Sequence, residues 1–149
     1  MNAAQLAALV VAGLNAVAAL AGLITYLRKG EGDLFWPLLR FAQVGAGAYA
    51  IYAGVLAATG HHPKEGLFYL YALLPIAVGF IAEQLRLSSA SLVLAKRGLE
   101  GREAVAALPR REQYELVYAI LRREVGVMAL AAFVVMCLAL RAAQTAHGV

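Results

Sequence analysis

Four apolar stretches, each about as long as a membrane-crossing helix, constrain the fold of this chain more than any other feature. They cover about residues 4–27, 35–58, 66–85 and 125–142, and a spanning helix needs roughly 20 predominantly apolar residues. The chain is 62% hydrophobic and only 15% charged, whereas soluble domains carry roughly 25% charged residues. The sequence therefore predicts an all-α, polytopic membrane protein with four transmembrane helices in a single domain, residues 1–149.

Basic residues predict which side of the membrane each connection faces. With both termini outside (N-out/C-out), eleven of the 13 Lys and Arg residues lie on the inner side, and only Lys64 and Arg141 lie outside. This asymmetry follows the positive-inside rule and favours a multi-pass protein of the bacterial plasma (inner) membrane. The first basic residue, Arg28, follows the first apolar stretch, so we expect a permanent span and not a removable signal peptide. We interpret the net charge of +4 first as a signal of membrane topology and second as a possible contact with anionic lipid. No interleaved pattern of basic and aromatic residues indicates binding to nucleic acid.

The connection between the third and fourth stretches, about 86–124, keeps a helical pattern on both sides of a short linker. LSSASLVLAKRG continues the third helix as far as Gly98, a residue typical of helix ends. Pro109 can open a helix that runs directly into the fourth stretch. We expect the two arms to project as a hairpin on the cytoplasmic side, or alternatively to lie flat on the inner surface as amphipathic segments. The apolar residues that would join the arms are Leu87, Val93, Leu94, Leu116, Val117, Ile120 and Leu121.

Polar side chains within the apolar stretches are the first candidates for function, because hydrocarbon penalises an unpaired charge. Arg40 and Glu83 lie at similar depth in the inner leaflet, so we expect them to form an ion pair with Gln43 and Gln84 nearby. One interpretation of this group is a clamp between helices. In the functional alternative, Glu83 is a proton- or cation-coupling carboxylate, and Asn15 and Gln43 form a polar lining.

Histidines and the cysteine are weak candidates for a metal or cofactor site. His61 and His62 are adjacent in the outer turn, and His147 lies in the tail. A buried haem needs ligands that project from helices into the bundle, and none of the four stretches contains a histidine. Zinc or copper would need a third ligand, from Glu65 or His147, while Cys137 has no partner for an intrachain disulfide and is expected to be a small buried apolar residue. We predict no cofactor, with a haem or quinone kept as an alternative.

Aromatic residues gather in the middle and outer half of the second and third stretches. They are a candidate ligand cleft for a quinone headgroup or another amphipathic molecule, and the ordinary alternative is an aromatic belt at the membrane surface. The residues of this candidate cleft are Tyr49, Tyr52, Phe68, Tyr69 and Tyr71. At the same end, Glu65 and Arg141 are expected to pair, or Arg141 anchors the last helix by snorkelling.

A row of small residues and the lack of catalytic motifs are the basis for our prediction of function. Ala46, Ala50, Gly54 and Ala58 recur at steps of four, which is typical of a helix-packing face within one chain or between copies. No nucleotide-binding loop or catalytic triad is present. We expect a non-enzymatic membrane protein, either a homo-oligomer or an accessory subunit of a membrane complex, whose basic hairpin contacts a partner or anionic lipid. The alternatives are a small channel or transporter with a polar pathway between helices, and a quinone- or haem-binding electron-transfer subunit.

With Asn15 in the first span, Gln43 in the second, and the segments FYLYALLP and LALRAA, the chain resembles small uncharacterised four-helix membrane proteins of actinobacterial type. The resemblance implies the four-span topology and draws attention to Asn15, Gln43 and Arg141. It implies no activity. In that pattern a histidine often stands near the start of the third span, where this chain carries Phe68. This difference weakens any haem or metal role that the resemblance would imply.

Overall fold

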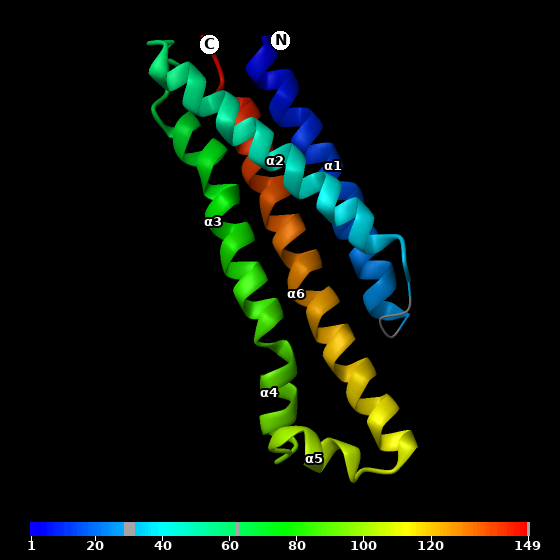
Figure 1. Cartoon of the computed structure of the whole chain (residues 1–149). Coiled ribbons are helices and arrows are strands. Elements are labelled where there is room, and N and C mark those ends of the chain that lie inside the picture. The colour runs from blue at the N-terminus through cyan, green and yellow to red at the C-terminus, as the bar shows by residue number, and fades with distance from the viewer. Residues whose placement is uncertain (29–31, 62, 149) are drawn as a thin grey trace.

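The computed structural model describes residues 1–28, 32–61 and 63–148. In these ranges the chain forms six helices and no strand, which confirms the all-α prediction (Figure 1). Four of them, α1, α2, α3 and α6, are long and apolar enough to cross a membrane. In chain order the helices are α1 (Ala3–Leu27), α2 (Phe35–Ala58), α3 (Leu67–Leu87), α4 (Ser89–Lys96), α5 (Gly101–Ala106) and α6 (Arg110–Thr145).

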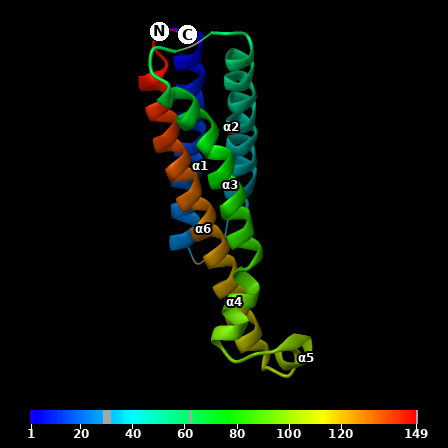
Figure 2. The same cartoon turned by 90° about the vertical axis from the view of Figure 1, so that its left-hand side faces the viewer.

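The four long helices run up and down in a ring. Helix α1 packs on α2 and α6, and α3 packs on α2 and α6, so both termini lie at the end of the bundle where α2 turns into α3 (Figures 1 and 2). Hydrogen bonds tie the chain ends together there. Asn2 Nδ2 donates to the carbonyl of Ala146 (2.5 Å) and the N–H of Lys64 donates to the carbonyl of His147 (3.0 Å). This arrangement agrees with an even number of spans.

Helix α4 continues the direction of α3, but it is a separate helix and not the unbroken extension that we predicted. The division falls at Ser88, whose hydroxyl donates to the carbonyl of Gln84 (2.9 Å). The next hydroxyl, of Ser89, donates to the carbonyl of Leu85 (3.0 Å). Serine bonds to the preceding turn compete with the regular helix ladder and bend helices, which accounts for the break.

The end of α4 follows the sequence prediction. Gly98 has a φ of +67°, which costs glycine nothing. Its N–H donates to the carbonyl of Ala95 (3.1 Å), and the N–H of Leu99 donates to the carbonyl of Leu94 (3.0 Å). This pair of bonds is the Schellman motif, which satisfies the last carbonyls of a helix.

Helices α4 and α5 and the first half of α6 form the predicted hairpin, which extends past the ends of α1 and α2 (Figures 1 and 2). The predicted linker is not wholly irregular, because α5 forms within it and Gln113 Nε2 secures the following turn through the carbonyl of Leu108 (2.9 Å). Leu116 is buried where α4 packs on α6. Leu87 and Val117 are exposed instead, so the predicted apolar seam is narrower than expected.

The core of the bundle is divided along its length into two clusters of buried residues. The cluster near the termini contains Tyr49 and Phe68 among many alanines. The cluster near the hairpin contains Phe35, Leu39 and Met128. The two clusters meet near the middle of the bundle.

Small residues let the helices approach closely. The tightest point is Gly22 of α1, where an added Cβ would lie 2.5 Å from the Cβ of Ala129 in α6 and 2.7 Å from the ring of Phe35. The predicted small-residue row in α2 is used in part, since Ala46 and Ala50 are buried but the rest of that row is exposed. Close packing through small residues is typical of helices in lipid.

Candidate functional site

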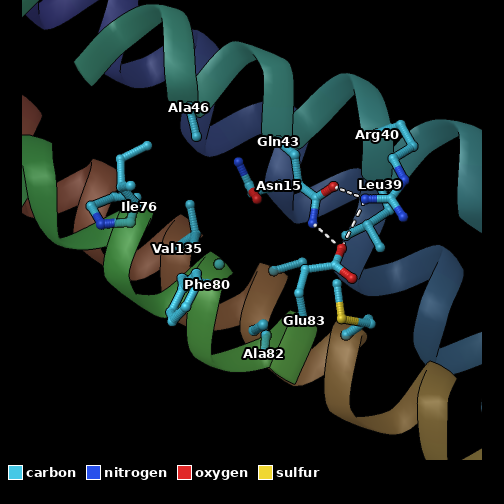
Figure 3. A pocket seen from close by; sticks show the side chains of 15 residues that line it. Asn15, Leu39, Arg40, Gln43, Ala46, Ile76, Phe80, Ala82, Glu83 and Val135 are labelled. Atoms are coloured by element: carbon cyan, nitrogen blue, oxygen red, sulfur yellow. Dashed lines mark hydrogen bonds and ion pairs between the residues drawn. The ribbon is translucent and has the colours of Figure 1, made fainter. Parts of the chain in front are cut away.

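A charged cluster joins α2 to α3 near the hairpin end of the bundle (Figure 3). Arg40 Nη1 lies 2.8 Å from Glu83 Oε1, and this confirms the predicted contact between the two residues. Gln43 Nε2 donates to the same carboxylate oxygen (3.2 Å), and Gln43 Oε1 accepts from Arg40 Nη1 (2.7 Å). Arg86 Nε lies 2.7 Å from Glu83 Oε2. Both oxygens of Glu83 are therefore engaged by cationic side chains.

Arg86 links this cluster to the start of α2. Its guanidinium carbon lies 5.7 Å from the centre of the Trp36 ring, within the range of a cation-π contact. Gln84 does not join the cluster as we predicted: its side chain is exposed and takes part in no hydrogen bond between described residues. The reason is its direction, because neighbouring residues on a helix point about 100° apart and Glu83 already faces α2.

A cavity of about 310 Å³ opens beside the charged cluster. Figure 3 shows it between α2 and α3, with α1 and α6 behind. It lies where the two core clusters meet, and most of its wall is apolar, while Asn15, Arg40, Gln43 and Glu83 supply the polar groups. The apolar part of the wall includes Leu39, Ile76, Phe80, Met128, Ala132 and Val135.

Asn15 is the most buried polar residue of this wall, with only 2% of its surface exposed. Its side chain points into the cavity (Figure 3). Asn15 Nδ2 donates to the carbonyl of Val11 in its own helix (2.9 Å). An amide NH₂ is a donor and the amide oxygen is an acceptor. The acceptor of this side chain, Oδ1, receives no hydrogen bond from the described residues. The predicted polar lining of Asn15 and Gln43 is present, but Asn15 makes no hydrogen bond to another helix.

The predicted aromatic cleft is not a cleft, because its residues pack against one another. The rings of Tyr49 and Phe68 are buried and meet edge to face at 6.4 Å. Phe68 also contacts Tyr69 (5.2 Å), and Tyr52 contacts Tyr49 (6.5 Å). Tyr69 donates its hydroxyl to the carbonyl of His61 (2.8 Å). These side chains fill the core of the terminal half of the bundle instead of lining a space.

The predicted pair of Glu65 and Arg141 does not form. Arg141 instead lies over the ring of Tyr71 at 5.8 Å and donates to Gln144 Oε1 (2.9 Å). Gln144 lies three residues further along the same helix, so Arg141 reaches it without ordering a second element. Glu65 is exposed in the turn before α3.

The histidines do not converge in the described part of the chain. His61 Nδ1 contacts Thr59 Oγ1 (3.1 Å), and His147 Nδ1 contacts Gln5 Nε2 (3.1 Å). His62 lies outside the described residues. Among the residues that are described, no group of three His, Cys, Asp or Glu side chains could hold a metal ion. Cys137 is exposed, contrary to the burial that we expected, because it lies on the outward face of α6.

Two features of the structure, the cavity and a second groove, were not predicted from the sequence. The cavity depends on four helices that are far apart in the chain, and only the isolated amide at Asn15 hinted at it. A second groove, of about 600 Å³, runs between α1 and α6. At its hairpin end the guanidinium carbon of Arg122 lies 4.4 Å from the centre of the Tyr26 ring.

Comparisons of the chain with protein-family models, curated proteins and solved structures give no match.

Proposed function

We propose that this protein is a non-enzymatic, multi-pass protein of the bacterial inner membrane that serves as an accessory subunit of a membrane complex. Its four long helices anchor the hairpin at the inner face, and the hairpin contacts the partner. The observation that carries the proposal is an apolar face of α6 that is buried inside the bundle and exposed on the hairpin.

The length of α6 favours a hairpin that projects. Its 36 residues extend for roughly 54 Å at 1.5 Å per residue, whereas the hydrocarbon core is about 30 Å thick. Because α6 is one continuous helix, the part outside the membrane cannot turn to lie flat on the surface. We therefore expect it to extend about 20 Å from the inner face.

The exposed apolar face is the continuation of the buried one. Tyr114 and Val117 are 65% and 50% exposed, respectively, and Leu121 lies one turn further on the same face. Eighteen residues make five full helical turns. The positions 18 residues beyond these three are Ala132, Val135 and Ala139, and all are buried in the bundle core.

The missing cover is best supplied by an amphipathic helix of a partner subunit. By this register the exposed face continues the side of α6 that packs in the bundle. The described parts of α1 and α2 end before the hairpin, so neither helix covers this face there (Figure 1). A single helix from another subunit can lie there at the usual 8–10 Å between axes.

The charge on the hairpin also favours a partner at its tip and anionic lipid only at its base. Residues 96–115 contain five basic and four acidic residues, which gives a net charge of only +1 (5 − 4). At about 20 Å from the membrane this tip lies beyond a Debye length of about 8 Å, so anionic lipid would not hold it. Arg28, Arg86 and Arg122 lie at the base of the hairpin, where headgroups of anionic lipid are in reach.

Native gel mass of the membrane-extracted complex tests the proposal. We expect the unaltered chain to migrate well above its 15.8 kDa, and the double variant Tyr114→Glu, Val117→Glu to migrate as a monomer, because a charge on each position penalises the apolar contact. The control is Ala95→Glu, an exposed position on α4, which should keep the complex.

Site-specific photo-crosslinking in native membranes then identifies what lies on the face. A photoreactive residue at Val117 should give an adduct that is lost in the Tyr114→Glu background and is missing for the same probe at Glu112, on the opposite side of α6. An adduct of twice the chain mass would show a second copy and overturn the partner assignment. A monomeric unaltered chain with no adduct at Val117 would overturn the proposal as a whole.

A channel or transporter is the second candidate, and the cavity with Asn15 and Gln43 is the observation in its favour. The saturated contacts of Glu83 argue for a clamp, so Glu83→Gln should lower the thermal midpoint without changing ion or solute flux in proteoliposomes. Removing a charged hydrogen-bond partner costs about 1.5–3 kcal/mol when it is buried, and the partial exposure of Glu83 and Arg40 places the loss at the lower end. A flux carried by the unaltered chain and abolished in Glu83→Gln, at unchanged stability, would favour transport.

A further inference from the structure

We propose that the cavity between α2 and α3 binds the hydroxyl headgroup of a neutral amphipathic molecule, with Asn15 Oδ1 as the acceptor. This site is separate from the partner-binding face of the hairpin. It uses the side-chain oxygen of the buried residue Asn15, which lines the cavity and accepts no hydrogen bond from the described residues.

The unsatisfied acceptor defines the first requirement. Asn15 is almost completely buried, and its Nδ2 is already bonded to Val11, so Oδ1 faces the cavity without a donor. A molecule in the cavity gains from bringing a donor to this atom.

Gln43 supplies the second half of the contact. Its amide carries two N–H groups, and the structure assigns one of them to Glu83 Oε1. The other remains for an acceptor in the cavity that Gln43 and Asn15 both line. A hydroxyl is donor and acceptor at once, so a single hydroxyl can donate to Asn15 and accept from Gln43.

The charges around the cavity favour a neutral headgroup. The lone pairs of Asn15 Oδ1 and the carboxylate of Glu83 repel an anion at the deep end. Arg40 and Arg86 oppose a cation, because together they outnumber the single negative charge of Glu83. A cation gains no matched partner, since both oxygens of Glu83 are already engaged. An anion would meet Arg40, whose Nη1 already donates to Gln43 and Glu83.

The rest of the cavity suits an apolar body that enters from lipid. Its volume of about 310 Å³ lies near the lower limit of ligand cavities, about 300–1,000 Å³, which is enough for a headgroup but not for a long chain. Ile76 and Phe80 line the cavity and are exposed on the surface of α3. A tail can therefore leave between α2 and α3 into the surrounding hydrocarbon.

Two lipid-soluble sources carry this chemistry, a hydroquinone and a diacylglycerol. The probes are a short-tailed naphthohydroquinone, held reduced, and dioctanoylglycerol, titrated into the detergent-solubilised full chain and counted by native mass spectrometry. We expect one molecule of at least one probe per chain, and the probe that binds identifies the source. If the hydroquinone binds, its oxidised quinone should bind at least tenfold more weakly, because it has no hydroxyl to donate.

Two variants locate the site. Asn15→Leu keeps the size of the side chain and removes the acceptor, and it should weaken hydroxyl-probe binding at least tenfold. Gly79→Leu should fill the cavity, because Gly79 lines it and a Cβ added there meets no atom within 4 Å. Gly47→Leu is the matched control in α2, since its Cβ also meets nothing within 4 Å and the residue lies outside the cavity.

Folding of each variant is checked by its thermal midpoint before titration. All three substitutions are apolar and in open or matched space, so we expect them to fold. Saturable binding that both Asn15→Leu and Gly79→Leu weaken, and Gly47→Leu does not, supports the site. Binding unchanged by Asn15→Leu and Gly79→Leu, or no saturable binding of either probe, would overturn it.

Discussion

At the scale of single residues, the bundle depends on which side chains are small and which are polar. Gly22 allows α1 to meet α6, and Asn15 leaves one acceptor facing a cavity. Arg40 and Arg86 hold Glu83 from two sides. Substitutions at these positions therefore test three separate properties: the packing of helices at Gly22, ligand binding at Asn15, and the ion pairs that join α2 to α3 at Glu83.

The packing prediction concerns Gly22→Ala. The new Cβ would lie 2.5 Å from Ala129 Cβ and 2.7 Å from the ring of Phe35, far inside van der Waals contact, so the helices must shift. Overpacking of this kind costs typically about 1–3 kcal/mol. The free energy of unfolding in mixed detergent micelles, followed by circular dichroism, should fall by that amount.

The matched control is Gly13→Ala in the same helix, where the added Cβ meets nothing within 4 Å. This substitution should leave stability unchanged or raise it, because alanine is about 1 kcal/mol better than glycine within a helix. Equal stability of the two variants would show that α1 and α6 do not approach as closely as the structure indicates.

At the scale of elements, local sequence was sufficient for the helices and insufficient for their contacts. The third apolar stretch, predicted at 66–85, becomes Leu67–Leu87, and Gly98 ends α4 through a Schellman motif as expected. These features depend on runs of apolar residues and on glycine at a positive φ, which a single sequence displays. The Arg40 to Glu83 contact was predictable because a charge at that depth requires a partner.

Contacts between distant segments were harder to predict. Tyr49 and Phe68 were expected to line a cleft, but aromatic rings gain more by packing against one another in a core. Arg141 had two partners within reach, and the one on its own helix required no further ordering. Helix α5 was missed because six residues are too few to show a clear apolar period. The cavity at Asn15 is a property of four helices together.

At the scale of the whole molecule, charge is distributed unequally between the two ends of the bundle. The end with both termini carries Lys64 and Arg141, and the other ten basic residues that the structure describes lie toward the hairpin. The structure brings the two termini and the turn before α3 together by hydrogen bonds. Any membrane orientation must therefore place these three segments on one side and the hairpin on the other.

The positive-inside rule selects between the two orientations, and cysteine labelling in intact cells tests the choice. In a Cys137→Ser background, Glu65→Cys marks the turn before α3 and Ala107→Cys marks the hairpin, and both positions are exposed. A membrane-impermeant maleimide should label Glu65→Cys in intact cells and Ala107→Cys only after permeabilisation, which also serves as the control for reactivity. The reverse pattern would place the hairpin outside. A partner helix on the cytoplasmic side could then not cover Tyr114 and Val117, so this experiment also limits where that partner must be sought.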